Sequence, residues 1–271
     1  MVRPAFLVAL VAALVAAGAS LEFSASSRAR MLRSGVAPAS RSLAGGPVAR
    51  PPATPGHHHH ARRARHHAAP APTEVLRVRD GARIPLRERP GGRVLARVGD
   101  HTDFGSATTL SVVERRGRWA SVPATVLGNG RLGWVDTADP ALARRTTTVA
   151  LVVRLGRRQL ELRSRGRVVR TVPVAVGKPG TSTPRGRFAV TDKMRGGRFG
   201  PYYGCCILAL TGHQPRVPSG WTGGDRLAIH GTNAPASIGT ASSAGCLRAA
   251  EADLVALMRT VPAGAPVVIR D

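Results

Sequence analysis

Short runs of alternating apolar and polar residues, separated by glycines, fill the chain from about residue 74 onward. Four such runs lie at residues 75–78, 93–98, 109–113 and 119–122. Alternation with a period of two is typical of strands that bury one face, and glycine-rich breaks are typical of turns. This spacing predicts a small β-barrel over residues 74–145.

The remaining residues, 146–271, carry further strand signals and one helix signal. Strands are predicted by apolar runs at residues 147–153, 160–162, 168–176, 227–229 and 267–269. Leu254, Leu257, Met258 and Val261 repeat at helical spacing, and Pro262 stops the helix that they predict. We expect this apolar helix face to pack in the core. The fold class expected for the chain is mainly β.

The first residues have the pattern of an export signal. Arg3 precedes an uncharged, apolar run over residues 4–19, in which Ala17 and Ala19 are the small residues that a signal peptidase accepts. The run is short for a membrane span, so residues 1–23 are expected to be either a cleaved signal peptide or a retained anchor. Either reading places the protein in the cell wall or periplasmic space, secreted or N-terminally membrane-anchored.

Residues 24–73 are rich in Pro, Ala, Arg and His and lack aliphatic periodicity. Such a composition cannot bury enough apolar surface to offset its chain entropy, which predicts an extended, disordered stalk. The His tracts at residues 57–60 and 66–67 would bind transition metals weakly and without a fixed geometry. We therefore predict no specific metal site and no cofactor.

A net charge of +25, from 40 Lys and Arg residues, would suit a polyanionic partner. Only Lys178 and Lys193 are lysines, and an Arg bias beside abundant Ala, Gly, Pro and Val is what GC-rich coding produces. The sequence contains no groove-entering or base-stacking element, so no nucleic-acid partner is expected. Weak attraction to an acidic wall polymer is the favoured interpretation of the charge.

The chain has three cysteines, which excludes a disulfide-rich scaffold and leaves an odd thiol. Cys205 and Cys206 are adjacent, and adjacent cysteines bridge only with strain. We therefore expect two free or partly buried thiols there, replaceable by Ser without loss of chemistry. Cys246 stands apart as the candidate for chemistry.

A cysteine and a histidine are placed where they could act together. The apolar run at residues 227–229 delivers His230 at its end, and Cys246 follows 16 positions later, directly after Gly245. A thiolate is a competent nucleophile, and an imidazole within hydrogen-bond reach would lower the thiol pKa and later protonate a leaving amine. Gly245 would let backbone N–H groups converge on an oxyanion. From these residues alone, a buried cysteine and a satisfied core histidine remain an alternative.

The strings around this pair are more specific. Residues 230–239 read HGTNAPASIG and residues 242–248 read SSAGCLR. Together they resemble the catalytic motif of the YkuD-type L,D-transpeptidases, as do residues 174–178 with 183–188 and residues 261–267. The resemblance spans residues 146–271 and implies a mixed β-sandwich with one or two short helices. It also implies attack on the third residue of a peptidoglycan stem peptide, release of D-alanine and transfer of the acyl group to an amine.

The resemblance assigns the catalytic roles. Cys246 would be the nucleophile and His230 the base, and the family orients the imidazole through the next residue, here the backbone carbonyl of Gly231. Ser243 matches the motif serine. Ala244 stands where many members have His, so any role of that imidazole in the oxyanion site is absent.

Substrate contacts are assigned in the same way. Arg248 replaces the Asn of other members and could bind a stem carboxylate, or it could form a structural ion pair with Glu251 or Asp253. Asn233 and Tyr203 are further candidates, the latter in a segment where the family places a loop over the donor pocket. Carbapenem-type inhibitors are expected to acylate the cysteine.

Residues 86–92, 118–122 and 133–135 resemble a bacterial SH3-like wall-targeting domain, which would span residues 74–145. Trp119 and Trp134 are expected to be core or barrel-edge packing residues there. Two other functions stay open at this point. One is a weak or inactive wall-binding or scaffolding protein that lost its activity through Ala244, and the other is an L,D-carboxypeptidase-type hydrolase.

Overall fold

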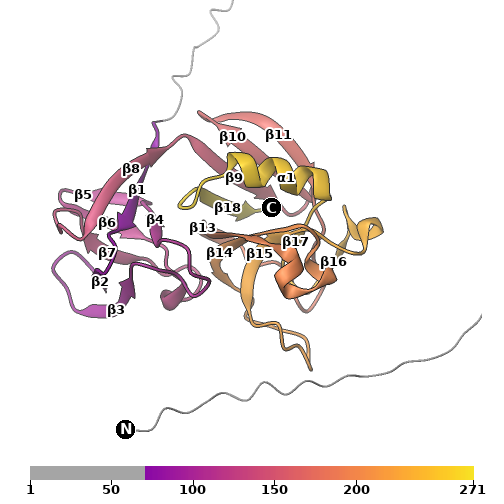
Figure 1. Cartoon of the computed structure of the whole chain (residues 1–271), viewed down its shortest axis with the longest axis horizontal. Helices are drawn as coiled ribbons and strands as arrows, with labels where there is room; N and C mark the ends of the chain where they lie inside the picture. The colour runs from indigo at the N-terminus through magenta and orange to yellow at the C-terminus, as the bar shows by residue number, and fades with distance from the viewer. Residues whose placement is uncertain (1–70) are drawn as a thin grey trace, which may run out of the picture. The chain divides into compact units, whose positions relative to one another are not determined.

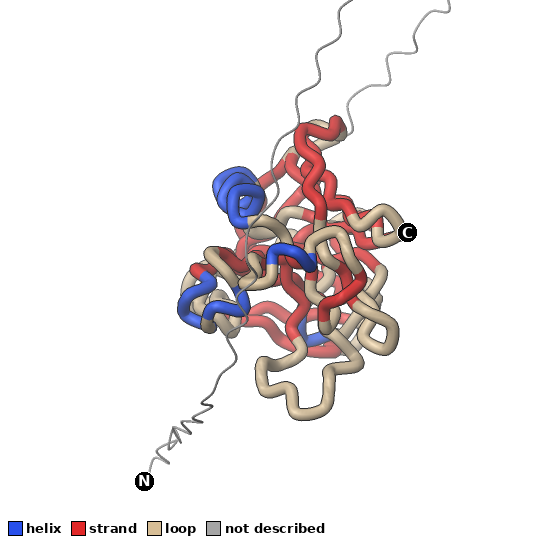
Figure 2. Tube along the Cα trace, turned by 90° about the vertical axis from the view of Figure 1, so that its right-hand side faces the viewer, coloured by secondary structure: helices blue, strands red, loops and turns tan. Residues whose placement is uncertain are grey.

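The computed structural model describes residues 71–271 (Figure 1). Strands and loops make up almost all of this part of the chain, as Figure 2 shows. The predicted leader and nearly all of the predicted stalk, with its His tracts, lie outside the described residues. From residue 71 onward, no helix is long and apolar enough to cross a membrane.

Residues 73–147 form two antiparallel sheets around a hydrophobic core of their own. One sheet has the order β4-β1-β8, with β1 Thr73–Val78, β4 Thr109–Ser111 and β8 Leu142–Thr147. The other has the order β3-β2-β7-β6-β5, with β2 Arg83–Arg87, β3 Val94–Gly99, β5 Glu114–Arg116, β6 Trp119–Val122 and β7 Gly133–Asp136. A short 3-10 helix, η1 Thr125–Leu127, precedes β7.

The core of this region comes from the alternating positions of the sequence. Leu76 and Val78 of β1, and Ile84 and Leu86 of β2, are buried in one cluster. Trp134 is also buried, whereas Trp119 is half-buried. The burial of Trp134 fits a core position, and the partial burial of Trp119 fits a position at the edge of the core. Wall targeting by an SH3-like domain here stays a prediction.

Residues 149–270 form an eight-stranded mixed sheet of order β11-β10-β9-β18-β13-β14-β15-β17. Its strands are β9 Val149–Arg154, β10 Gln159–Ser164, β11 Arg167–Pro173, β13 Gly186–Arg195, β14 Cys206–His213, β15 Arg226–His230, β17 Leu247–Arg248 and β18 Pro266–Arg270. A two-stranded parallel pair joins β12 Val176–Gly177 to β16 Ala241–Ser243. Three 3-10 helices, η2 Gly196–Phe199, η3 Pro201–Tyr203 and η4 Pro235–Ser237, lie in the connections. The expectation of a mainly β fold is confirmed.

Helix α1 Glu251–Thr260 is the one α-helix among the described residues. Leu254 and Leu257 are fully buried in the core of the eight-stranded sheet, as the helical spacing predicted. Burial of each of these side chains contributes about 1.5–3 kcal/mol to the stability of the fold. Glu251 opens the helix, so that its carboxylate lies at the end of the sheet where β14, β15 and β17 meet.

Candidate active site

The register of two neighbouring strands brings the candidate cysteine and histidine to one face of the sheet. Strands β15 and β17 are parallel, and Ile229 lies opposite Leu247. These two side chains are fully buried in the core. Because side chains alternate along a strand, Ala228, His230 and Cys246 face the other way. His230 and Cys246 line one pocket, so the fold joins the two residues that the sequence singled out.

His230 is fully buried, and its two ring nitrogens have different surroundings. Its Nδ1 lies 2.6 Å from the carbonyl oxygen of Gly231. A carbonyl only accepts, so Nδ1 carries the proton and donates it. The Nε2 atom has no hydrogen-bond partner among the described residues and is the free basic nitrogen. The contact with Gly231 is the one that the sequence motif implied.

Burial also sets the charge of this imidazole. Removal from water lowers the pKa of His230 to about 4; the Gly231 carbonyl opposes this change and the charge of Arg248 adds to it. His230 is therefore neutral at pH 7. A neutral imidazole with a free Nε2 can accept a proton, which is what a general base requires.

Cys246 is a half-buried free thiol. Its Sγ donates to the carbonyl oxygen of Arg226 at 3.7 Å. The thiol packs beside a small apolar cluster formed by Met194, Ile207, Ala209 and Ala228. This burial raises the pKa of Cys246 to about 11, against smaller opposing effects from the Ala228 backbone and the charge of Arg248.

The expectation that the imidazole would lower the thiol pKa is therefore wrong for this structure. Desolvation of the thiolate outweighs every attractive contact that Cys246 makes. At pH 7 the pair consists of a neutral thiol and a neutral imidazole. In this state the site holds no preformed thiolate.

The turn before Cys246 is held by hydrogen bonds from near and distant residues. From a distance, Thr183 Oγ1 donates to the Gly245 carbonyl at 2.7 Å and the Gln214 amide donates to the Ala244 carbonyl at 3.0 Å. Gly245 has a φ of 127°, and a Cβ at this position would overlap the Gln214 amide. Ser243 is buried; its Oγ accepts the Gly245 N–H at 3.0 Å and donates to the Cys246 carbonyl at 2.6 Å. Ser243 thus fixes the nucleophile's turn and does not face the pocket. The sequence had suggested the Gly245 N–H as an oxyanion donor. It is not free for that role, because it already donates to Ser243 Oγ.

Arg248 is buried, and its guanidinium donates to the Ser242 carbonyl at 2.8 Å. Its Nε has no partner among the described residues. Neither acid proposed for an ion pair contacts it, because Asp253 pairs with Arg170 and Glu251 accepts a backbone N–H. The ion-pair alternative is therefore wrong, and a role for Arg248 toward a substrate carboxylate stays a prediction.

Aromatic side chains cover the imidazole. The rings of Tyr203 and Tyr202 lie 4.9 and 5.6 Å from that of His230, and the Tyr202 ring lies 5.8 Å from Trp221. All three aromatic residues line the pocket. Burial raises the pKa of Tyr203, with a further contribution from Cys246. Asn233 is exposed and does not line this pocket.

Trp221 is one of several pocket residues that the sequence did not single out, together with Gln214 and Arg226. It lies in a glycine-rich loop, where its Nε1 donates to the Gly224 carbonyl at 2.6 Å. The sequence does contain a signal for Trp221, a lone tryptophan between glycines. So large an apolar side chain in a loop is expected to pack against another part of the protein or against a ligand.

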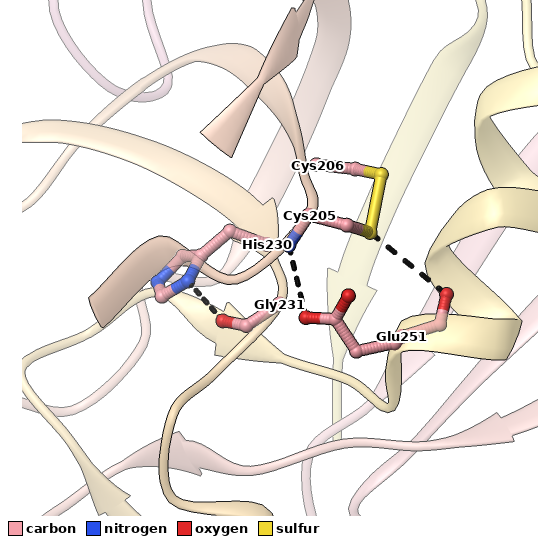
Figure 3. Close-up of a disulfide and its surroundings, with 5 residues drawn as sticks. All are labelled: Cys205, Cys206, His230, Gly231 and Glu251. Carbon is pink, nitrogen blue, oxygen red and sulfur yellow. Dashed lines mark hydrogen bonds between the residues drawn. A yellow bond between two sulfur atoms is a disulfide. The ribbon is translucent and has the colours of Figure 1, made fainter. Parts of the chain in front are cut away.

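Cys205 and Cys206 form a disulfide (Figure 3). The expectation of two free or partly buried thiols is wrong, because the two sulfur atoms are bonded to each other. Cys246 is thus the single free thiol of the three cysteines. No cluster of three or more His, Cys, Asp or Glu side chains in residues 71–271 could hold a metal ion.

A thiol and a neutral imidazole that share a pocket are typical of cysteine-dependent acyl-transfer enzymes. The family model of the YkuD L,D-transpeptidase catalytic domain matches residues 148–269, and the chain belongs to this family. This confirms the resemblance stated for its C-terminal part.

Two curated relatives are similar to the same part of the chain. The protein named "Putative L,D-transpeptidase YkuD" of Bacillus subtilis (strain 168) is 39% identical over 121 residues, which cover 44% of this chain and 64% of that protein. Its counterpart in Bacillus licheniformis is 39% identical over 126 residues, covering 46% and 67%. The chain thus spans about two thirds of the length of these relatives.

Solved structures with similar chains include an L,D-transpeptidase from Mycobacterium smegmatis. It is 18% identical, with 74% of this chain and 100% of that chain covered and a TM-score of 0.39. L,D-transpeptidase 3 from Mycobacterium tuberculosis, in complex with a faropenem-derived adduct, is 16% identical, with 52% and 73% covered and a TM-score of 0.38.

Proposed function

We propose that this protein is a cysteine-dependent L,D-transpeptidase that acts on peptidoglycan stem peptides. The observation that carries the proposal is the pair formed by Cys246 and His230 in one pocket, with the imidazole held through Nδ1 on Gly231 so that Nε2 is free. The family membership supplies the substrate class.

The proposed acylation step transfers one proton and exchanges one bond. His230 Nε2 takes the proton of the Cys246 thiol while the sulfur attacks the carbonyl carbon of the third stem residue. The tetrahedral intermediate collapses to a thioester, the C–N bond to D-alanine breaks, and His230 returns the proton to the leaving amine. The free basic nitrogen of His230 is suited to both transfers.

The second half of the reaction reverses these roles. An acceptor amine attacks the thioester, His230 takes a proton from that amine, and the Cys246 sulfur leaves and is reprotonated. Water attacking the same thioester would release a tripeptide instead, which is the carboxypeptidase-type alternative.

The test is mass spectrometry of the full chain incubated with a tetrapeptide stem and an amine acceptor. We expect release of D-alanine, a transient acyl adduct on Cys246 and a cross-linked product. The Cys246→Ala variant is the matched control and should give none of the three. D-alanine release that persists in this variant would refute the assignment of the nucleophile.

The proposal extends to inhibitors and location. A carbapenem should acylate Cys246 and raise the protein's mass by one intact drug molecule. Residues 1–23 would export the chain, the stalk would span wall layers, and residues 74–145 would bind the wall. Removal of the stalk, residues 24–72, should leave turnover of soluble peptide unchanged, whereas equal loss on soluble peptide and intact wall would contradict a tether role.

A further inference from the structure

The disulfide lies directly behind the candidate base and is tied to it by backbone contacts. The Gly231 N–H donates to the Cys206 carbonyl at 3.1 Å, and the Gly231 carbonyl in turn accepts the Nδ1–H of His230. Ile207, the next residue of β14, is the register partner of His230 in β15. The position of Cys206 is therefore passed to the imidazole through one residue, Gly231.

Glu251 holds the same segment from the other side. Its Oε1 accepts the Cys205 N–H at 2.9 Å, and its backbone carbonyl lies 3.9 Å from the Cys205 Sγ (Figure 3). The backbone carbonyl of Cys205 accepts the Gly196 N–H at 2.8 Å. Glu251, the first residue of α1, and the disulfide thus fix the short segment of chain at Cys205 and Cys206.

The contact between this piece and Gly231 is close. A Cβ at Gly231 would lie 2.9 Å from the Glu251 Oε1, 2.9 Å from the Gly204 Cα and 3.0 Å from the Tyr203 carbonyl oxygen. Backbone packed this tightly transmits displacement, because there is no side chain between the two segments to absorb it. A shift of Cys205 or Glu251 must therefore move Gly231, and with it the acceptor of the His230 proton.

We propose that Glu251 and the Cys205–Cys206 disulfide are positioning groups for His230: together they hold Gly231 where its carbonyl fixes the imidazole in the Nδ1–H form. This inference rests on the function proposed above. It reverses the expectation that the two cysteines could be replaced by Ser without loss of chemistry.

The arrangement makes the site sensitive to thiol reductants. A small dithiol gives two electrons and two protons to the bridge, the S–S bond breaks, two thiols form, and the dithiol closes to its own cyclic disulfide. Cys205 is half-buried, so its sulfur is accessible to such a reagent. The reduced chain keeps Cys246 and His230 but loses the constraint behind Gly231.

The experiment reads the imidazole directly and needs no turnover. We compare the full chain, labelled with 15N at histidine, as wild type, Glu251→Ala, Glu251→Gln and the double variant Cys205→Ser/Cys206→Ser, and assign the His230 signals from a His230→Gln sample. Wild type should show the Nδ1–H tautomer alone. Glu251→Ala and the double Ser variant should show a mixture of both tautomers, as should wild type treated with a dithiol.

Turnover of the tetrapeptide stem gives the second reading. Loss of positioning should reduce kcat roughly tenfold with KM unchanged, since a small misplacement of a catalytic group acts on the chemical step. Glu251→Gln keeps an acceptor oxygen and should restore both readings to wild type. Asp253→Ala is the matched control, because Asp253 lies in the same helix turn but pairs with Arg170, and it should match wild type.

Unchanged tautomers in Glu251→Ala and in the double Ser variant would overturn the inference, whatever their turnover. The same result in Asp253→Ala as in Glu251→Ala would also overturn it, because the effect would then come from the helix as a whole. A wild-type chain that shows the tautomer change on reduction but never releases D-alanine would refute the proposed function and support the positioning role.

Discussion

The two halves of the candidate site are supported in different ways. The Cys246 turn is held from within by Ser243, which contacts both Gly245 and the Cys246 carbonyl. The side chains of Thr183 and Gln214 add contacts from outside the motif, because they donate to the Gly245 and Ala244 carbonyls. His230 is held from afar, through a disulfide about 25 positions earlier in the chain and a helix that starts at Glu251. A support made by a residue of the motif, such as Ser243, can be read from the sequence, whereas a support made by distant segments cannot.

Of the changes that test this comparison, removal of the nucleophile should have the largest effect on activity. Cys246→Ala should reduce D-alanine release on the order of 10³-fold or more, because the sulfur supplies the covalent step. The free energy of unfolding should change by only about 1 kcal/mol, since one sulfur atom at a half-buried position contributes little packing. D-alanine release and urea unfolding measure the two effects. A variant that fails to fold would show that the thiol is structural.

Removal of the base should have the next largest effect. His230→Ala should slow acylation by a carbapenem on the order of 10²-fold or more, the scale of general acid-base catalysis. The rate for wild type should stay constant from neutral pH downward and then fall as pH drops through about 4, because protonation abolishes the basic Nε2. Intact-mass measurements over time give these rates. A wild-type rate that falls already at pH 6.5 would contradict the buried, neutral imidazole.

The raised thiol pKa gives an effect of similar size that needs no substrate. At pH 8, iodoacetamide should alkylate Cys246 on the order of 10²-fold more slowly than an ordinary thiol, because only the thiolate reacts. The rate should rise about tenfold for each pH unit and level off near pH 11, the value to which burial raises the pKa of Cys246. The chain unfolded in urea is the control. A plateau near pH 8.5 in the folded chain would refute the desolvated thiol.

The smallest expected effect concerns the residue where the motif departs from the family. Ala244→His should leave carbapenem acylation within roughly tenfold if backbone donors stabilise the oxyanion, since an imidazole would add one donor. Ala244 lines the pocket, and its carbonyl accepts the Gln214 amide at 3.0 Å, so the turn is already held without a side chain at 244. Drug uptake by this variant but not by wild type would favour the inactive wall-binding protein.

Much of the fold could be predicted because its strands bury one face. The run that became β10 alternates, and α1 repeats its leucines at helical spacing. Strand β14 was missed because it is buried on nearly every residue, and a continuous apolar run has no period to recognise. The predicted strand over residues 168–176 ends at Pro173, before the short β12.

The candidate site, like the fold, was predicted only in part. The motif pointed to Cys246, His230 and Gly231, and the structure places all three together. It did not point to Glu251 as a support for the base, because that contact depends on where α1 meets β14 and not on spacing. The sign of the thiol's pKa shift was missed because a sequence shows a neighbouring imidazole but not the water that burial removes.

The bridge between Cys205 and Cys206 also has a consequence for the maturation of the chain. Three cysteines allow three different single disulfides, and two of these would consume Cys246. Once the adjacent pair has bridged, neither of its cysteines can form a disulfide with Cys246, so the thiol of Cys246 has no cysteine partner left within its own chain.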